Sequence, residues 1–474
     1  MECINCKKAI EDDSMFCRYC GSKQTVICPS CGKELAGDSC FCSKCGTPLD
    51  SESKVTKTES KKNEGHTAAK APDLQFNRYI VIPKEIAESG DCKKVTEWFE
   101  AHSSDEYFTV ENGTEIINCL SVFTEKHDLC NPYIKKIIIP DSVTSIGNFA
   151  FKNCTALESI TIPHSVTSIG TSVFGGCTAL KNVNIPNSVT SLNGTFWGCT
   201  SLESVNIPNS VTSLIQTFNG CTSLESVNIP NSVTSLIDTV RGCTALKSIT
   251  IPDSVTSIGS YAFENCTSLK SIVIPSSVTS LGISAFCGCT ALESVTVLGP
   301  ITLIDQHTFG KCHSLKKISL PNSVKSTSYC SFSDCTSLES ITIPDSVTYI
   351  GEYSFAGCTA LKSIVIPDSV TSMGLRAFDG CTALESVTLP DSLEAIAYSA
   401  FANCTSLKSI NIPDSLTDIG SCAFKGCSNL TLVFSRNVKK VDEEAFSGCK
   451  VKLPANYYKG VFNEEALKGA EIVE

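Results

Sequence analysis

Eight of the nine cysteines in residues 1–48 are arranged in four Cys-x-x-Cys pairs. Residues 1–24 hold the first two pairs and residues 25–48 hold the other two, with ten residues between the pairs of each unit. Two such pairs place four thiolates at the corners of a tetrahedron, which is the geometry of a structural Zn²⁺ site. We therefore predict two zinc ions with these ligands: Cys3, Cys6, Cys17 and Cys20 in the first unit, and Cys28, Cys31, Cys42 and Cys45 in the second.

Each of these units is too short to build a hydrophobic core, so the metal must supply the folding energy, on the order of 10 kcal/mol per site. Four ligands leave no open position for catalysis, and a redox dithiol is the lesser alternative. The stretches CPSCGKEL and FCSKCGTPL resemble the knuckles of paired zinc ribbons, although Lys7 follows Cys6 where that family has glycine. Cys40 is left as a free thiol.

Charge argues against nucleic acid as the partner of this region. Residues 1–48 contain six Lys or Arg and six Asp or Glu, and four thiolates on each zinc ion add negative charge. The whole chain of 474 residues has a net charge of −11, and a phosphate-binding surface should be more basic. We expect the ribbons to dock protein or to act as a spacer.

Beyond a polar segment at residues 49–74, predicted to be a flexible linker, the chain becomes repetitive. A cysteine returns every 22 or 23 residues, which is typical of a solenoid whose units bury their apolar faces against their neighbours. These fourteen cysteines are at positions 154, 177, 199, 221, 243, 266, 289, 312, 335, 358, 381, 404, 427 and 449.

The unit from Leu361 to Ala383 shows the parts of one repeat. The sequence LKSIVI predicts a short strand that Pro367 ends, since proline cannot donate to a ladder. Gly374 is expected to permit a turn closed to other residues. The segment around Phe378 predicts a single helical or 3₁₀ turn on the opposite side.

If the repeats stack in register, equivalent side chains of successive repeats lie directly over one another. A phenylalanine precedes each column cysteine by three residues, with Val240 in one unit, so we predict a buried aromatic spine with the thiols packed beside it. Cys358 is therefore interpreted as a core residue, with a disulfide or redox role as the alternative. After each strand-opening leucine, Glu and Lys largely alternate, which we interpret as register control.

The consensus L-x-S-I-x-I-P-x-S-V-T-S-I-G-x-x-A-F-x-x-C-T-x resembles the leucine-rich repeat of the bacterial BspA-like class over residues 133–449. The resemblance implies a right-handed α/β-type solenoid, with short parallel strands on one face and short helical or 3₁₀ turns on the other. Residues 75–132, with a helix around VTEWFEAH, resemble its N-terminal cap. Residues 450–474 resemble its C-terminal cap, with a strand at Val451 and Leu453, a stop at Pro454 and then a polar helix.

No catalytic motif is recognisable, and none of the six histidines lies in a nucleophile or metal motif, so we expect neither an enzyme nor a small-molecule substrate. The strand face carries small polar residues and could hold an extended protein partner, through Asn184, Asn206, Asn228, Ser363 and Val365. Three consecutive units between residues 187 and 241 are one residue short, which should expose Trp197, Ile215 or Ile237. The alternative for these units is duplication of a slightly defective repeat.

Three cysteines outside the column, Cys287, Cys330 and Cys422, are expected to be incidental surface thiols. The start MECINCKKAIEDD does not match a secretory signal, and no apolar run could span a membrane. We therefore expect a cytoplasmic interaction scaffold, with a cell-surface adhesin exported by another route as the alternative. A nucleic-acid-associated regulator acting through the ribbons is the third possibility.

Overall fold

The computed structural model describes residues 79–118, 120, 122–123, 129–433, 437–452 and 464–473, together with 25–27 and 34–36. The chain divides into two compact units, Met1–Arg78 and Tyr79–Glu474. In the described part of the first unit, β1 (Thr25–Ile27) pairs antiparallel with β2 (Glu34–Ala36). The predicted linker at residues 49–74 lies outside the described residues.

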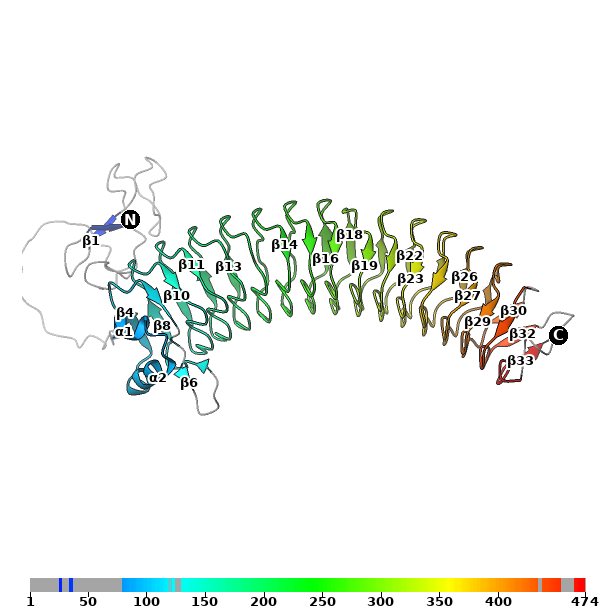
Figure 1. The fold of residues 1–474 in the computed structure, drawn as a ribbon, viewed down its shortest axis with the longest axis horizontal. Helices are drawn as coiled ribbons and strands as arrows, with labels where there is room; N and C mark the ends of the chain where they lie inside the picture. Colours follow the sequence, from blue (N-terminus) through cyan, green and yellow to red (C-terminus); the bar gives the residue numbers. More distant parts are fainter. Residues whose placement is uncertain are drawn as a thin grey trace, which may run out of the picture. The chain divides into compact units, whose positions relative to one another are not determined.

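The second unit is a solenoid of parallel strands, as the repeat predicts (Figure 1). Most coils contribute a first strand, which in the consensus repeat stands before the proline, and neighbouring first strands pair in parallel. Their bounds are β3 (Ile80–Ile82), β4 (Tyr107–Val110), β8 (Lys136–Ile138), β10 (Ser159–Thr161), β12 (Asn182–Asn184), β13 (Ser204–Asn206), β16 (Ser271–Ile274), β18 (Ser294–Val297), β20 (Lys317–Ser319), β22 (Ser340–Thr342), β24 (Ser363–Val365), β26 (Ser386–Thr388), β28 (Ser409–Ile410), β30 (Thr431–Val433), β32 (Lys450–Lys452) and β33 (Glu471–Val473).

A second, shorter strand follows the proline turn in most coils and forms its own parallel ladders. These strands are β5 (Ile116–Ile117), β9 (Ser145–Ile146), β11 (Ser168–Ile169), β14 (Ser235–Leu236), β15 (Ser257–Ile258), β17 (Ser280–Leu281), β19 (Leu303–Ile304), β21 (Ser326–Thr327), β23 (Tyr349–Ile350), β25 (Ser372–Met373), β27 (Ala395–Ile396), β29 (Asp418–Ile419) and β31 (Lys440–Val441). The register is one coil per step, with Ser363 opposite Ser386. The proline turn is closed by a backbone bond of 2.9 Å from Val370 N to Pro367 O.

The opposite side of each coil is built from consecutive hydrogen-bonded turns. Cys381 N donates to Phe378 O at 3.3 Å and Leu384 N donates to Cys381 O at 3.0 Å. These are the expected single turns, and within the described repeats none of them continues into a helix. Between coils, the backbone of this side is also bonded in register, as from Phe378 N to Ala400 O at 2.8 Å.

The predicted aromatic spine is confirmed. Successive rings stack 5.0 to 6.1 Å apart, with their planes within 14° of each other, and Val240 interrupts the stack. The spine phenylalanines from Phe151 to Phe446 are fully buried. Burial of each ring contributes roughly 1.5–3 kcal/mol, so the spine is a principal source of stability.

The glycine of the repeat is needed for a different reason from the one predicted. The φ of Gly374 is not in the left-handed region; instead, a Cβ at this position would lie 2.4 Å from Glu352 N of the preceding coil. The left-handed positions are Arg376 (φ 53°) and Gly380 (φ 74°). Glycine is therefore required at residue 374 because two coils approach closely, not because of its torsion angles.

The N-terminal cap extends the first ladder by β3 and β4 and adds α1 (Lys84–Ala87), α2 (Cys92–Ala101) and the antiparallel pair β6 (Val122–Phe123) and β7 (Leu129–Cys130). The predicted helix is confirmed as α2, which Asp91 caps by accepting from Lys93 N at 2.9 Å. Phe99 of α2 packs against Phe108 of β4 with ring centroids 5.4 Å apart.

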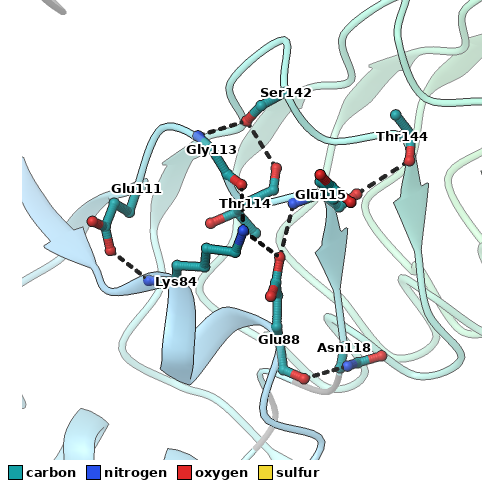
Figure 2. A network of polar contacts seen from close by, with 9 residues as sticks. All are labelled: Lys84, Glu88, Glu111, Gly113, Thr114, Glu115, Asn118, Ser142 and Thr144. Atoms are coloured by element: carbon teal, nitrogen blue, oxygen red, sulfur yellow. Dashed lines mark hydrogen bonds and ion pairs between the residues drawn. The ribbon is translucent and has the colours of Figure 1, made fainter.

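Polar contacts join the cap to the first coils (Figure 2). Lys84 Nζ donates to Gly113 O at 2.8 Å, and Glu88 accepts from Glu115 N at 2.9 Å through its carboxylate. Ser142 Oγ in turn donates to Thr114 O at 2.8 Å. The first two bonds link α1 and its C-cap Glu88 to residues 113–115, which precede β5, and the bond from Ser142 links this segment to the next coil.

The C-terminal end differs from the expected polar helix. Val451 lies in β32 as predicted, whereas Leu453 and Pro454 lie outside the described residues. Residues 464–469 form turns that lead into β33, and β33 pairs parallel with β32. The described chain therefore ends in one further strand of the ladder, because the segment after residue 463 again follows the path of a coil.

Candidate partner-binding surfaces

The predicted zinc ligands lie outside the described residues, but the two strands around one of the pairs are described. Ile27 of β1 is the register partner of Glu34 of β2, so residues 28–33 connect the two strands of a hairpin. That connection contains Cys28 and Cys31. Cys28 and Cys31 thus stand in the sequence between two paired strands, and the four-thiolate zinc site remains a prediction.

The column cysteines are core residues, as predicted. Cys358 is a fully buried free thiol, and its Sγ donates to Phe332 O of the preceding coil at 3.3 Å. Burial raises the pKa of the Cys358 thiol. The same S–H to carbonyl contact recurs from Cys177 to Cys449, with the carbonyl of Val240 as the acceptor for Cys266. These thiols are shielded and protonated, so they are not nucleophiles.

The prediction for the cysteines outside the column is wrong for Cys330, which is buried with 8 % of its surface exposed. Cys287 and Cys422 are half-buried. Cys330 has a left-handed φ of 54°, and its thiol lies beside Ser333 and Tyr329. We expected Cys330 to be exposed because polar residues occupy the equivalent position in other repeats. Its small thiol instead packs against the neighbouring side chains.

The strand face is exposed along the described coils. Asn184, Asn206, Asn228 and Ser363 are exposed, and Val365 has 66 % of its surface accessible. The parallel register places Asn184 directly opposite Asn206. The structure thus presents a regular row of small side chains on this face, and its use by a partner remains a prediction.

Charged residues beside this face form ion pairs between successive coils. Three of the predicted pairs are within 4 Å: Lys247–Glu225 at 2.8 Å, Lys362–Glu339 at 3.4 Å and Lys408–Glu385 at 2.7 Å. All six side chains are more than half exposed, so each pair contributes under about 1 kcal/mol. The alternation of Glu and Lys therefore favours the correct alignment of successive coils more than it stabilises the fold.

The three short coils expose apolar side chains, as predicted. Trp197, Ile215 and Ile237 have 47 %, 40 % and 40 % of their surface accessible. The first ladder also stops after β13 and resumes at β16, so residues 226–228 and 248–250 are not strands. Exposed Trp and Ile side chains favour an interface.

A second exposed apolar surface was missed by the repeat analysis. Exposed tyrosines occur in three of four successive coils, on the side that carries the second strands and the turns that follow them: Tyr329, Tyr349 and Tyr398. The signal was present in the sequence STSYCSF at 326–332, where the consensus SIGxxAF is lost. Departure from a repeat consensus marks a position where something other than the fold selects the residues.

Within the described residues, no three His, Cys, Asp or Glu side chains are grouped so that they could hold a metal ion. Among the same residues, no helix is both long enough and apolar enough to cross a membrane.

The fold and the repeat define a leucine-rich repeat solenoid. The model of the BspA type leucine-rich repeat region matches residues 125–240, 239–358 and 325–452 with six copies, and the chain belongs to this family. The model of the double zinc ribbon matches residues 3–50. This second match supports zinc binding by the N-terminal cysteines.

The solved structures with a similar fold include two bacterial leucine-rich repeat proteins. A leucine-rich repeat protein from Bacteroides ovatus is 26 % identical, covering 77 % of this chain and 93 % of that one, with a TM-score of 0.47. A leucine-rich cell surface protein from Faecalibacterium prausnitzii is 32 % identical, covering 63 % and 82 %, with a TM-score of 0.40. The comparison with curated proteins found no match. The family assignment rests on the family model.

Proposed function

We propose that this chain is a non-enzymatic scaffold for protein–protein interaction, in which zinc-stabilised ribbons are tethered to a leucine-rich repeat binding surface. The observation that carries this proposal is the exposed strand face, whose small side chains repeat in register from coil to coil. At about 4.8 Å per coil, fourteen coils span about 65 Å. An extended protein segment fits such a face better than a compact substrate does.

Pull-down with the full chain tests the scaffold. Asn206 is exposed on the strand face, and Asn206→Arg would place a long charged side chain in the row. We expect this change to reduce the amount of captured partner. Thr222→Arg is a matched control, because Thr222 is exposed but lies in the turns that follow the column cysteine. Equal capture by both variants would place the binding surface elsewhere, and no capture by the native chain would contradict the scaffold.

Metal analysis tests the ribbons. We expect about two zinc ions per chain, one for each set of four thiolates. Cys31→Ser should remove about one of them, whereas Cys40→Ser should remove none, since Cys40 lies outside the Cys-x-x-Cys pairs. A chain free of zinc would overturn this part of the proposal.

A gel shift with nucleic acid at moderate salt is expected to show no complex, because residues 1–48 are balanced in charge.

We propose a cytoplasmic location, and the column cysteines support it because all are free thiols. Cytosolic proteins keep thiols reduced, whereas secreted proteins usually form disulfides. Fractionation of the host cells distinguishes this location from the cell surface. Recovery of the chain in the surface fraction would favour the adhesin alternative.

A further inference from the structure

Two of the exposed tyrosines, Tyr329 and Tyr349, line a shallow depression of about 370 Å³ on coils near the middle of the solenoid. Its walls include Leu303, Tyr329, Tyr349 and Glu352, with the small residues Ser326 and Ser328 between them. Tyr329 has 42 % and Tyr349 has 36 % of its surface accessible. These side chains come from three successive coils, so the depression is a product of stacking and not of one loop.

The floor of the depression is built differently from the same position in other coils. Thr327 lies opposite the buried Ile304 of the preceding coil, and the pairing of Ser326 with Tyr349 places the buried Ile350 at the same position of the next coil. Its Oγ1 accepts from Gly351 N at 3.0 Å and from Ser354 Oγ at 2.8 Å. Buried hydroxyls are costly unless they are bonded, so this network fixes the floor at a place where the repeat needs only an apolar residue.

Charge and ring geometry indicate what the depression would bind. Among the described residues, no lysine or arginine lies within ion-pair distance of the exposed Glu352 carboxylate. In the coil directly after that of Glu352, the Arg376 guanidinium lies 5.7 Å from the Tyr353 ring and 5.5 Å from the Tyr398 ring. The same surface thus already holds one cation between tyrosines. Burial raises the pKa of Tyr349, and Glu352 adds to that shift.

We propose that this depression binds a lysine or arginine side chain of an extended protein partner, with Glu352 as its counter-ion and the rings of Tyr329 and Tyr349 against the cation. A cation near an aromatic face is attracted by the ring quadrupole, and a carboxylate beside the ring strengthens the site. A phosphate group would be repelled by Glu352 and by the net charge of −11. The inference rests on the scaffold proposal and names the chemistry of the partner.

Titration calorimetry with the full chain at low salt tests the site. The probe is an octapeptide of alternating arginine and serine, and its counterpart carries citrulline, which keeps the shape of arginine and removes the charge. We expect the arginine peptide to bind at least roughly five-fold more tightly than the citrulline peptide. Equal binding of the two peptides would overturn the proposal.

Substitutions locate the binding. Glu352→Gln and Tyr349→Ala should each weaken binding of the arginine peptide by roughly three- to ten-fold, while Tyr349→Phe should retain it because the ring remains. Glu443→Gln is the matched control, since Glu443 occupies the equivalent exposed position of a later repeat, and no exposed tyrosine lies among the described residues of that repeat. A similar loss in the Glu443 variant would indicate general charge attraction and overturn the site.

The same variants separate this site from the scaffold proposal. If the native chain captures a protein and Glu352→Gln captures it equally well, the tyrosine site is wrong and the scaffold stands. If the native chain captures no protein, the scaffold fails whatever the peptide result.

Discussion

At the scale of single residues, the column cysteine performs two tasks that few side chains can combine. It is small and weakly polar, so it fills the space beside the phenylalanine spine, and its S–H satisfies a carbonyl of the preceding coil. Cys381 shows this with a contact of 3.2 Å to Phe355 O. Serine would bury a stronger polar group, and alanine would leave a gap.

This burial predicts an alkaline loss of stability. Burial raises the pKa of Cys381 to about 12, whereas an unfolded cysteine titrates near about 8.5. Between these values the folded state keeps the proton that the unfolded state has lost. The contribution of this thiol to the free energy of unfolding is therefore fully present below about pH 8.5. The contribution is lost as the pH rises toward the pKa of the folded state, by up to about 1.4 kcal/mol per pH unit per thiol.

Urea denaturation between neutral pH and the onset of lysine titration measures this slope. Cys381→Ala should be less stable at neutral pH, because it loses sulfur packing, but its stability should fall less steeply with pH than that of the native chain. Other titrating groups are common to both chains, so the difference in slope isolates one thiol. Identical slopes would show that the Cys381 thiol titrates normally in the fold.

At the scale of the element, the repeat was predictable because each strand, proline and phenylalanine has one dominant physical role. Pro367 ends a strand wherever it stands, and Phe378 has to be buried, so period and residue type were enough. Gly374 was harder, since a glycine is explained equally well by a left-handed φ or by close approach of another chain. Only the neighbouring coil decides between them, and it lies 23 residues away in the sequence.

Prediction of the binding surfaces from the sequence was limited in the same way, because it used one repeat at a time. The exposure of Val365 and Trp197 followed from alternation and from a missing residue, both of which are local signals. Burial of Cys330 and the depression around Tyr349 depend on side chains from adjacent coils, which the average repeat does not describe. A comparison of each unit with the consensus would have indicated residues 326–331 as exceptional.

Close approach at Gly374 can be tested directly. A Cβ 2.4 Å from Glu352 N forces a backbone shift, so Gly374→Ala should lower the free energy of unfolding by about 1–3 kcal/mol. The control is Ala397→Gly, at the equivalent position of the next coil, where a Cβ is already accommodated. There we expect only the loss of about 0.5–1 kcal/mol from backbone entropy. Stabilisation by Gly374→Ala would mean that the coils are free to separate.

At the scale of the whole solenoid, stability is a sum over coils and the contacts between neighbours, so a local defect stays local. The short coils are such a defect. On the turn side the backbone remains bonded across them, with Gly220 N to Arg241 O and Gly242 N to Glu264 O both at 2.7 Å. On the strand side the ladder is absent between β13 and β16. At this point the first ladder is missing, while the second ladder, with β14 paired to β15, and the turn side remain bonded.

Hydrogen exchange should reveal this asymmetry. Because amides outside a ladder lack its bonds, we expect residues 226–229 and 248–251 to exchange faster than residues 271–274 of β16, which belong to the same solenoid and serve as the internal reference.

The third short coil reads SLIDTV where full coils read SLGxxAF, so inserting a glycine between Leu236 and Ile237 restores the length of 23 residues. This insertion should slow exchange at residues 226–229 toward the level of β16, because the longer turn side lets the strand side align with its neighbours. If the insertion leaves the exchange rates unchanged, the missing ladder has a cause other than coil length. If residues 226–229 of the native chain are already as protected as β16, the solenoid is uniformly bonded.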